Sequence, residues 1–160
     1  MSDLLGVAIT GVSGRMGQML VESVHASETV KLVGALERPD HPWIGQDLGR
    51  MMQKSGTGLI VQDKAENVFV HADVVIDFTT PAATVAFSKQ AAQTETAHVI
   101  GTTGLNDEDL AAVAKAAKTT VIVRAGNMSL GVNLLVQVTK KVAAALDEDF
   151  DIEVIEAHHN

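Results

Sequence analysis

The sequence contains no cysteine among its 160 residues. This absence excludes a disulfide framework, a zinc site built from thiolates and a cysteine nucleophile. Basic residues are also scarce, since 12 Lys and Arg face 20 Asp and Glu and give a formal net charge of −8. A surface of that sign repels phosphate polyanions, so the composition disfavours DNA or RNA as a partner while still allowing a local anion pocket.

Long hydrophobic runs are missing as well. No apolar stretch reaches the roughly 18 residues of a membrane span, so no membrane association is expected. The N-terminal sequence MSDLLGVAITG has neither the basic region nor the cleavage site of a signal peptide, and it predicts the first strand of a cytoplasmic protein. The length predicts one full domain and the start of a second, and a hydrophobic content of 46% is enough for an ordinary core.

Short apolar runs alternate with longer stretches that have helical spacing. The runs are almost continuously apolar, which is typical of parallel strands covered on both faces by helices. This alternation predicts an α/β fold of the Rossmann type, with a doubly wound and mostly parallel sheet. The predicted strands are 5–10, 30–36, 73–78, 98–101, 121–125 and 152–155, with a further short strand at 59–61.

The helices between the strands have recognisable beginnings. Pro81 is suited to open a helix, because its missing N–H costs little in the first turn. Asn106 is suited to cap a helix over 107–118, whose acidic first turn favours the helix dipole. Two more helices are predicted at 15–25 and 130–146. The segment 38–54, with two prolines, two glycines and the only tryptophan, predicts a long surface loop.

A glycine-rich turn joins the first predicted strand to the first predicted helix. Its sequence is GVSGRMG at 11–17, with the spacing G-x-x-G-x-x-G. In a dinucleotide-binding loop, Gly11 would allow the tight turn, Gly14 would let a pyrophosphate approach the backbone, and Gly17 would let the helix lie close to the sheet. The helix N-terminus then directs its N–H groups at the phosphates. The same turn also occurs in proteins without a ligand.

Two charged residues follow the second predicted strand. Glu37 stands 20 positions after Gly17, where a carboxylate can accept hydrogen bonds from the ribose hydroxyls of an adenosine. Arg38 beside it can pair with a 2′-phosphate or lie flat on the adenine. The pair therefore predicts that both NADH and NADPH are accepted, although Arg38 as an ordinary loop cation remains open.

Small polar residues follow three later strands, at 77–81, 101–104 and 124–133. In a doubly wound fold the ligand lies beyond the carboxyl ends of the strands, so three such ends favour a cofactor cleft. His158 and His159 follow the last predicted strand, and a histidine pair can supply a general acid and an anion donor. A metal site is not expected, because only Glu156 stands nearby as a third ligand.

Six motifs in order along the chain resemble one enzyme family, 4-hydroxy-tetrahydrodipicolinate reductase, also called dihydrodipicolinate reductase. They are GVSGRMG at 11–17, Glu37-Arg38, DFTTP at 77–81, GTTG at 101–104, GNMSLGVN at 126–133 and EAHH at 156–159. The resemblance implies hydride transfer from NADH or NADPH to a cyclic imine dicarboxylate in lysine and diaminopimelate biosynthesis. It implies that His158 is the catalytic acid/base and that His159 binds a substrate carboxylate. The implied cofactor-binding residues are Gly11, Val12, Ser13, Gly14, Arg15, Met16, Glu37, Arg38, Phe78, Gly101, Thr102, Thr103, Ala125, Gly126, Asn127 and Met128.

The sequence departs from this family in two ways. Met128 stands where the family usually has an aromatic residue, and a thioether can also cover a ring face. The family continues past the histidine pair with a lysine, a Pro-Ser-Gly-Thr run, most of a substrate domain whose sheet builds a homotetramer, and a segment that returns to the nucleotide domain. We therefore expect a dinucleotide-binding domain at 1–128 and the start of a truncated substrate domain at 129–160. We expect these residues alone to bind the cofactor but not to turn over substrate.

Two other functions share part of this pattern. A second two-domain dehydrogenase, of the homoserine or aspartate-semialdehyde type, would share the glycine turn, but the semialdehyde type needs a cysteine nucleophile. A nucleotide-sensing domain without chemistry would also share the turn and Glu37, but it has no use for a histidine pair at a strand end.

Overall fold

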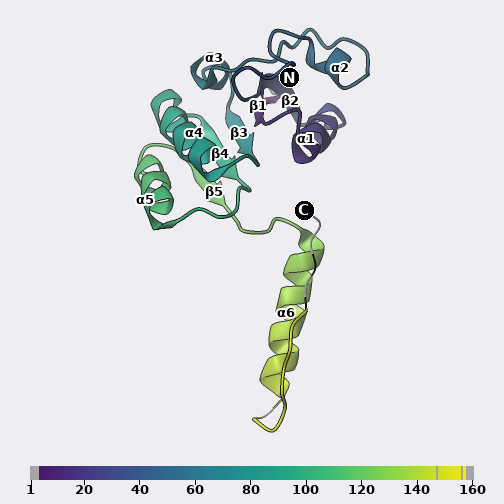
Figure 1. Ribbon diagram of the computed structural model, residues 1–160, viewed down its shortest axis with the longest axis vertical. Helices are drawn as coiled ribbons and strands as arrows, with labels where there is room; N and C mark the ends of the chain where they lie inside the picture. The colour runs from purple at the N-terminus through teal and green to yellow at the C-terminus, as the bar shows by residue number, and fades with distance from the viewer. Residues whose placement is uncertain (1–3, 147, 156, 158–160) are drawn as a thin grey trace. The chain divides into compact units, whose positions relative to one another are not determined.

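The computed structural model of the chain describes residues 4–146, 148–155 and 157. It divides into two compact units, Met1–Gly126 and Asn127–Asn160, which are described separately below. Figure 1 shows the strands and most of the helices in the first unit, and one long helix in the second.

The first unit is built on five parallel strands. They are β1 (Leu5–Thr10), β2 (Val30–Leu36), β3 (Val74–Asp77), β4 (Ala97–Ile100) and β5 (Ile122–Arg124). Their order in the sheet is β2-β1-β3-β4-β5, and every neighbouring pair is parallel. The direction of winding reverses between β1 and β3, which is where ligands bind in open sheets of this kind. The predicted Rossmann-type α/β fold is confirmed.

The described part of the chain contains six helices, five in the first unit and α6 in the second. They are α1 (Arg15–His25), α2 (Leu48–Met51), α3 (Ala65–Phe69), α4 (Pro81–Thr94), α5 (Asp107–Ala116) and α6 (Leu130–Ala145). The Thr80 hydroxyl caps α4, and Pro81 occupies its first turn as predicted. Asn106 caps α5 and forms a reciprocal capping box with Asp109, which satisfies two backbone N–H groups at once.

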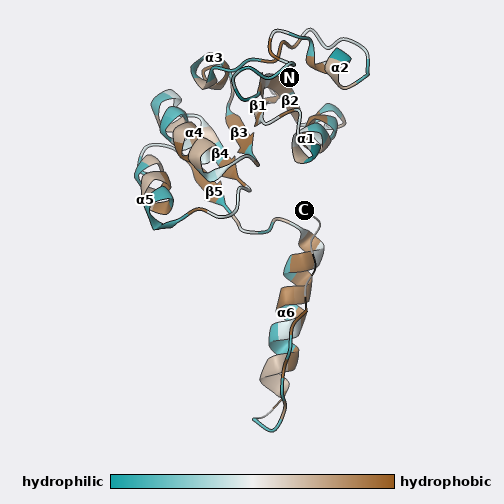
Figure 2. Cartoon of the chain, in the orientation of Figure 1, coloured by the Kyte–Doolittle hydropathy of each residue, from teal (hydrophilic) through white to brown (hydrophobic). Residues whose placement is uncertain are grey.

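Helices cover the two faces of the sheet unequally. One apolar cluster lies between the sheet and α3 and α4, and a second lies under α1 and the segment that carries α2. Figure 1 shows α4 and α5 on one side of the strands and α1 on the other, and Figure 2 shows the apolar strands between them. On the α1 side, three aligned residues lie on β3, β4 and β5. Ile76 and Val99 are half-buried, whereas Val123 is 52% exposed. The expectation that helices cover both faces is therefore met fully on one face and only over β1 and β2 on the other.

The segment 38–54 is more ordered and more buried than a surface loop. It contains the short helix α2, and Leu48 at the start of α2 is fully buried in the apolar cluster under α1. The Asp47 side chain accepts hydrogen bonds from the N–H groups of Arg50, Thr57 and Gly58 and so fixes the turn. Trp43, Ile44 and Met52 also pack against this cluster. The prediction of a surface loop therefore holds only in part, because the prolines and glycines indicated a loop and gave no sign of these apolar contacts.

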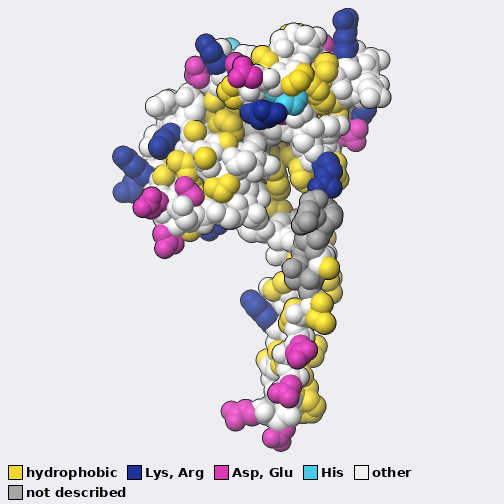
Figure 3. Space-filling view, in the orientation of Figure 1, with side chains coloured by type: hydrophobic (Ala, Val, Ile, Leu, Met, Phe, Trp, Pro, Cys, Tyr) yellow, Lys and Arg dark blue, Asp and Glu magenta, His cyan; other side chains and the backbone are white. Residues whose placement is uncertain are grey.

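The predicted strand at 59–61 is present only as isolated bridges of Ile60 with Asp47 and of Gln62 with Leu36. The predicted strand at 152–155 is wrong, because those residues form no strand in the part of the chain that the structure describes. An apolar run needs a partner strand for its N–H and C=O groups, and no described segment supplies one. Its side chains are exposed, as are most apolar residues of α6, which has no buried residue. Figure 3 shows these hydrophobic side chains along the C-terminal unit.

One buried carboxylate joins several elements at the carboxyl edge of the sheet. Asp77 is fully buried at the end of β3 and accepts hydrogen bonds from the hydroxyl of Thr10 on β1 at 3.1 Å and the hydroxyl of Thr84 on α4 at 2.6 Å. The backbone N–H and the hydroxyl of Thr79 donate to the same carboxylate at 3.0 and 2.6 Å. The hydroxyls of Thr84 and Thr102 lie 2.9 Å apart, which extends the network to the segment after β4.

These contacts decide the charge of Asp77. Burial raises the pKa of this carboxyl, but the neighbouring His98, Thr79 and Thr84 outweigh that effect and hold the pKa below its ordinary value. His98 Nε2 lies 3.4 Å from Asp77 Oδ2 without good hydrogen-bond geometry, so we regard it as an electrostatic neighbour. The other ring nitrogen of His98 lies 3.2 Å from the Ser88 hydroxyl, and all three groups are buried. Asp77, His98 and Ser88 are the residue types of a catalytic triad and follow one another in the same sequence of contacts. They are not an active site, because none of the three side chains reaches solvent.

We predict that Asp77→Asn lowers the free energy of unfolding by about 1–3 kcal/mol at pH 7, because an amide cannot accept all of these donors. The native pKa lies below the unfolded value, so this stabilisation is complete above the ordinary pKa of 3.8 and is lost as the pH falls through the lower native pKa. Urea unfolding of both proteins between pH 7 and pH 3 measures the effect.

The exposed Asp40 provides a matched control, since Asp40→Asn should leave the unfolding midpoint nearly unchanged at each pH. A difference between wild type and Asp77→Asn that stays constant down to pH 3 would contradict the charged state assigned to Asp77.

Candidate functional site

The glycine turn begins where β1 ends. Gly11 has a φ of +64°, in the left-handed region that favours glycine. Its N–H and that of Val12 both donate to the carbonyl of Leu36 at the end of β2, at 2.8 and 3.3 Å, and the N–H of Gly14 returns to the carbonyl of Gly11. These bonds fold the turn tightly against the ends of the two strands.

The helix that follows lies close to the turn. A Cβ at Gly17 would overlap the carbonyl oxygen of Gly11 and the Cα of Val12, so only glycine permits this approach. Gly14 caps α1 without a side-chain hydrogen bond, and the first turn of α1 holds no acidic residue. The turn therefore has the geometry and the electrostatics of an anion cradle at a helix N-terminus.

Glu37 is attached to this turn. Its Oε2 accepts hydrogen bonds from the N–H and the hydroxyl of Ser13, at 3.0 and 2.7 Å, and its Oε1 accepts from the N–H of Arg38 at 2.9 Å. Burial raises the pKa of Glu37, but these hydrogen bonds and the nearby His41 outweigh it and hold the pKa below its ordinary value. Glu37 is thus a carboxylate at neutral pH, and it retains lone pairs for further donors.

A cavity of about 490 Å³ opens between the turn, the end of β2 and the start of α4. It brings together six of the residues predicted for a cofactor: Gly11, Ser13, Gly14, Glu37, Arg38 and Phe78. The volume is typical of a small-molecule site, and the lining combines apolar walls with a few polar groups. Its place beside β1 and β3 is also the point where the winding of the sheet reverses.

The segment after β4 supports one wall of this cavity. A Cβ at Gly101 would overlap the ring of Phe78, so the glycine allows the ring to lie flat against the strand end. The Thr102 hydroxyl accepts a hydrogen bond from the N–H of Thr79 at 3.0 Å and is nearly buried. Its side chain thus holds the neighbouring loop, whereas Thr103 is exposed.

The remaining predicted residues lie in different surroundings. The Val12 side chain is fully buried in the apolar cluster under α1, so only its backbone remains for a ligand, while Arg15 and Met16 are exposed in the first turn of α1. Ala125 and Gly126 end the first unit, and the N–H of Ala125 donates to the carbonyl of Ile100. The structure does not place the last four predicted residues against the cavity, since Asn127 and Met128 belong to the second unit and His158 and His159 lie outside the described residues.

The cavity also contains residues that the sequence did not assign. The most informative is Thr79, whose N–H and hydroxyl donate to the buried Asp77 behind the cavity. Both residues stand in the DFTTP motif, and neither had a predicted role of its own. An aspartate that ends an apolar strand and precedes two threonines is a usable signal, because a buried carboxylate needs local donors. Thr80 belongs to the same motif. No comparable signal marks the other lining residues, which are Leu36, Pro39, Asp63, Ala83 and Phe87.

Two further searches concern only the described part of the chain. Within it, no group of three His, Asp or Glu side chains is arranged to hold a metal ion. None of its helices is both long enough and apolar enough to cross a membrane.

Comparison with known proteins identifies the relatives of this chain. Residues 5–128 match the family described as dihydrodipicolinate reductase, N-terminus. The 4-hydroxy-tetrahydrodipicolinate reductase of Ruegeria pomeroyi is 62% identical over the whole of this chain, and that of Roseobacter denitrificans is 56% identical. The chain spans about 60% of the length of these relatives.

Solved structures agree with this comparison. A dipicolinate-bound dihydrodipicolinate reductase from Paenisporosarcina sp. TG-14 superposes with a TM-score of 0.68 and 29% identity, over 88% of this chain and 54% of that protein. An aspartate semialdehyde dehydrogenase with NADP from Candida albicans superposes with a TM-score of 0.56 at 15% identity, over 78% of this chain and 43% of that protein, and shows the fold alone. With the family match over residues 5–128, these similarities show that the chain belongs to the dihydrodipicolinate reductase family.

Proposed function

We propose that this chain is the NAD(P)H-binding part of a 4-hydroxy-tetrahydrodipicolinate reductase, which forms tetrahydrodipicolinate in lysine and diaminopimelate biosynthesis. The observation that carries the proposal is the carboxylate of Glu37, bonded to the glycine turn through Ser13 at the edge of one cavity. The names of the relatives support the reaction, and membership of a family that uses NAD(P)H supports the cofactor.

The residues of the cavity fit a dinucleotide. The cradle formed by Gly11 and Gly14 at the start of α1 suits a pyrophosphate, since no side chain caps that helix end. Glu37 suits the ribose hydroxyls, and the Phe78 ring forms an apolar wall beside them. When bound, the cofactor supplies the hydride, and the residues of this chain hold and orient it.

The substrate site requires residues that the cavity does not contain. We propose that His158 is the catalytic acid/base and that His159 binds a carboxylate of the dicarboxylate substrate. Gly101, Thr102, Thr103, Ala125, Gly126, Asn127 and Met128 complete the proposed cofactor site toward the nicotinamide. Because the chain spans about 60% of its relatives, we propose that it binds the cofactor alone but turns over substrate only within a longer protein.

The open face of the sheet is consistent with a longer protein. Val123 and the half-covered Val99 and Ile76 leave apolar surface on the side of α1. We propose that a segment of the longer protein covers this surface, and that the assembled enzyme is a cytoplasmic homotetramer. The net charge of −8 supports the absence of a nucleic-acid partner.

Cofactor choice gives a first test. We expect NADH and NADPH to bind with affinities within a factor of ten, about 1.4 kcal/mol, because Glu37 favours a free ribose and Arg38 tolerates a 2′-phosphate. Arg38→Ala should weaken NADPH more than NADH, and calorimetric titration of both cofactors measures this. Arg50→Ala is the matched control, since Arg50 is exposed on α2 and does not line the cavity. Equal losses for the two cofactors in Arg38→Ala would refute the role of Arg38.

The histidine pair gives a second test, in a full-length reductase that contains this chain. His158→Gln should lower kcat by about 10²–10⁴, the range typical of removing one acid/base group, while the dissociation constant of NADPH stays nearly unchanged. Steady-state kinetics and a cofactor titration measure the two quantities. The exposed His71 provides the control, because His71→Gln should retain normal turnover. Near-normal turnover in His158→Gln would remove His158 from the chemistry and make His159 the candidate.

A further inference from the structure

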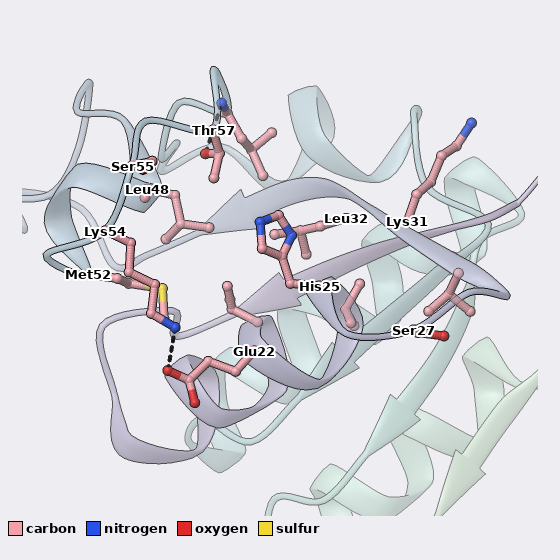
Figure 4. Close-up of a pocket in the computed structure, with 15 residues that line it drawn as sticks. Glu22, His25, Ser27, Lys31, Leu32, Leu48, Met52, Lys54, Ser55 and Thr57 are labelled. Atoms are coloured by element: carbon pink, nitrogen blue, oxygen red, sulfur yellow. Dashed lines mark hydrogen bonds and ion pairs between the residues drawn. The ribbon is translucent and has the colours of Figure 1, made fainter.

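A second cavity, of about 510 Å³, lies between α1, the start of β2 and the segment around α2 (Figure 4). It shares no lining residue with the cavity at the glycine turn. It is also distinct in chemistry, because it has no part of the glycine turn and its lining is mostly apolar. The proposed reductase function makes no use of it.

The cavity follows from the shortness of the helices in the connection between β2 and β3, which runs from residue 37 to residue 73. In a doubly wound fold such a connection usually carries a helix long enough to cover its strand. Here α2 has only four residues, which span about 6 Å, so it cannot fill the space beside the eleven-residue α1. The cavity is the part of this space that α2 leaves unfilled.

The wall on the α2 side is held in place by the protein itself. The carboxylate of Asp47 binds three backbone N–H groups across the segment, and Gly49 packs directly against the carbonyl of Ser55. Leu48 is fully buried beneath the cavity. Such fixed walls resist collapse, so the space persists for a ligand.

The floor and the rim differ in polarity. Figure 4 shows the imidazole of His25 facing Leu32 and Leu48, with Lys54 and Glu22 at one side. The Lys54 Nζ and the Glu22 Oε1 lie 2.7 Å apart and join α1 to the α2 segment, and both side chains are about half exposed. The floor is made of apolar side chains, namely Val21, Val24, Val30, Leu32, Leu48, Met52 and Leu59.

Hydrogen-bond donors lie at one side of the rim. Lys54 is the lysine at the cavity mouth, whereas Figure 4 shows the Lys31 side chain extending away from the cavity. The Lys54 ammonium has three donors, of which Glu22 takes one, and His25 adds a ring N–H. An ammonium with donors to spare and a ring N–H above an apolar floor are complementary to one negative head group on an apolar body.

We propose that this cavity binds a small monocarboxylate with an apolar body. The body lies on Leu32, Leu48 and Met52, and the carboxylate contacts Lys54 and His25 at the rim. An uncharged ligand with the same apolar body makes no ionic contact with Lys54. A dianion carries more negative charge than the rim can balance.

The probe for the test is 4-phenylbutyrate, with the uncharged 4-phenyl-1-butanol as its analogue. We expect saturable binding of the acid that shifts the backbone amide NMR signals of α1 and the α2 segment, and at least tenfold weaker binding of the alcohol. Lys54→Gln should weaken the acid at least fivefold. Lys89→Gln, an exposed lysine on α4 at the other face of the sheet, should leave its affinity unchanged.

A second variant tests the volume of the cavity. Met52→Trp should abolish binding of both probes by filling the floor, while circular dichroism confirms that the variant is folded. The proposal is overturned if no saturable binding occurs, if the shifted amides cluster at Ser13 and Glu37 instead, if the alcohol binds as tightly as the acid, or if Lys54→Gln and Lys89→Gln bind equally. None of these outcomes depends on whether NADH or NADPH binds at the glycine turn.

Discussion

The carboxyl edge of the sheet depends on one buried charge. Asp77 ends β3 where no water reaches it, so the protein itself must supply every donor. Those donors come from Thr10 on β1, Thr84 on α4 and Thr79 in the following loop. The Thr84 hydroxyl also lies within hydrogen-bond distance of the Thr102 hydroxyl, in the segment after β4. A single carboxylate thereby fixes the ends of two strands, the start of a helix and two loops relative to one another.

The cavity at the glycine turn is built on that fixed edge. Gly11 follows Thr10, and Phe78 follows Asp77, so two of its walls are adjacent in the chain to members of the network. The second carboxylate, Glu37, has a different position, because it lies at the cavity, where it accepts hydrogen bonds from the N–H and hydroxyl of Ser13 and from the N–H of Arg38. The buried acid maintains the shape of the site, and the acid at the cavity edge is available for a ligand.

Local signals in the sequence predicted much of this arrangement. The five sheet strands, the Asn106 cap, the Pro81 helix start and the glycine turn follow from apolar runs and from residues whose backbone preferences are strong. The place of Glu37 beside the glycine turn also follows in outline, because Gly17 and Glu37 have the spacing of a dinucleotide fold. Its hydrogen bonds with Ser13 were not predicted. These features depend on residues close together in the sequence or on a connection of standard length.

Other features depend on contacts that no local pattern reports. The burial of Leu48 requires the segment 38–54 to fold back under α1, and its prolines and glycines indicated only a loop. The run 152–155 has the composition of a strand but no partner among the described residues. The network around Asp77 joins residues up to 67 positions apart, so its members become neighbours only in the folded sheet. Sequence patterns thus located the elements, whereas the partners of each element came from the fold.

The central claim is that the cavity between the glycine turn, Glu37 and Phe78 holds the adenosine half of a nicotinamide cofactor. A crystal structure of this chain with NADPH tests it most directly. The account predicts density for the pyrophosphate at the N–H groups that begin α1 and a ribose hydroxyl within hydrogen-bond distance of a Glu37 carboxylate oxygen. Well-defined cofactor density elsewhere on the chain, with this cavity filled only by solvent, would contradict it.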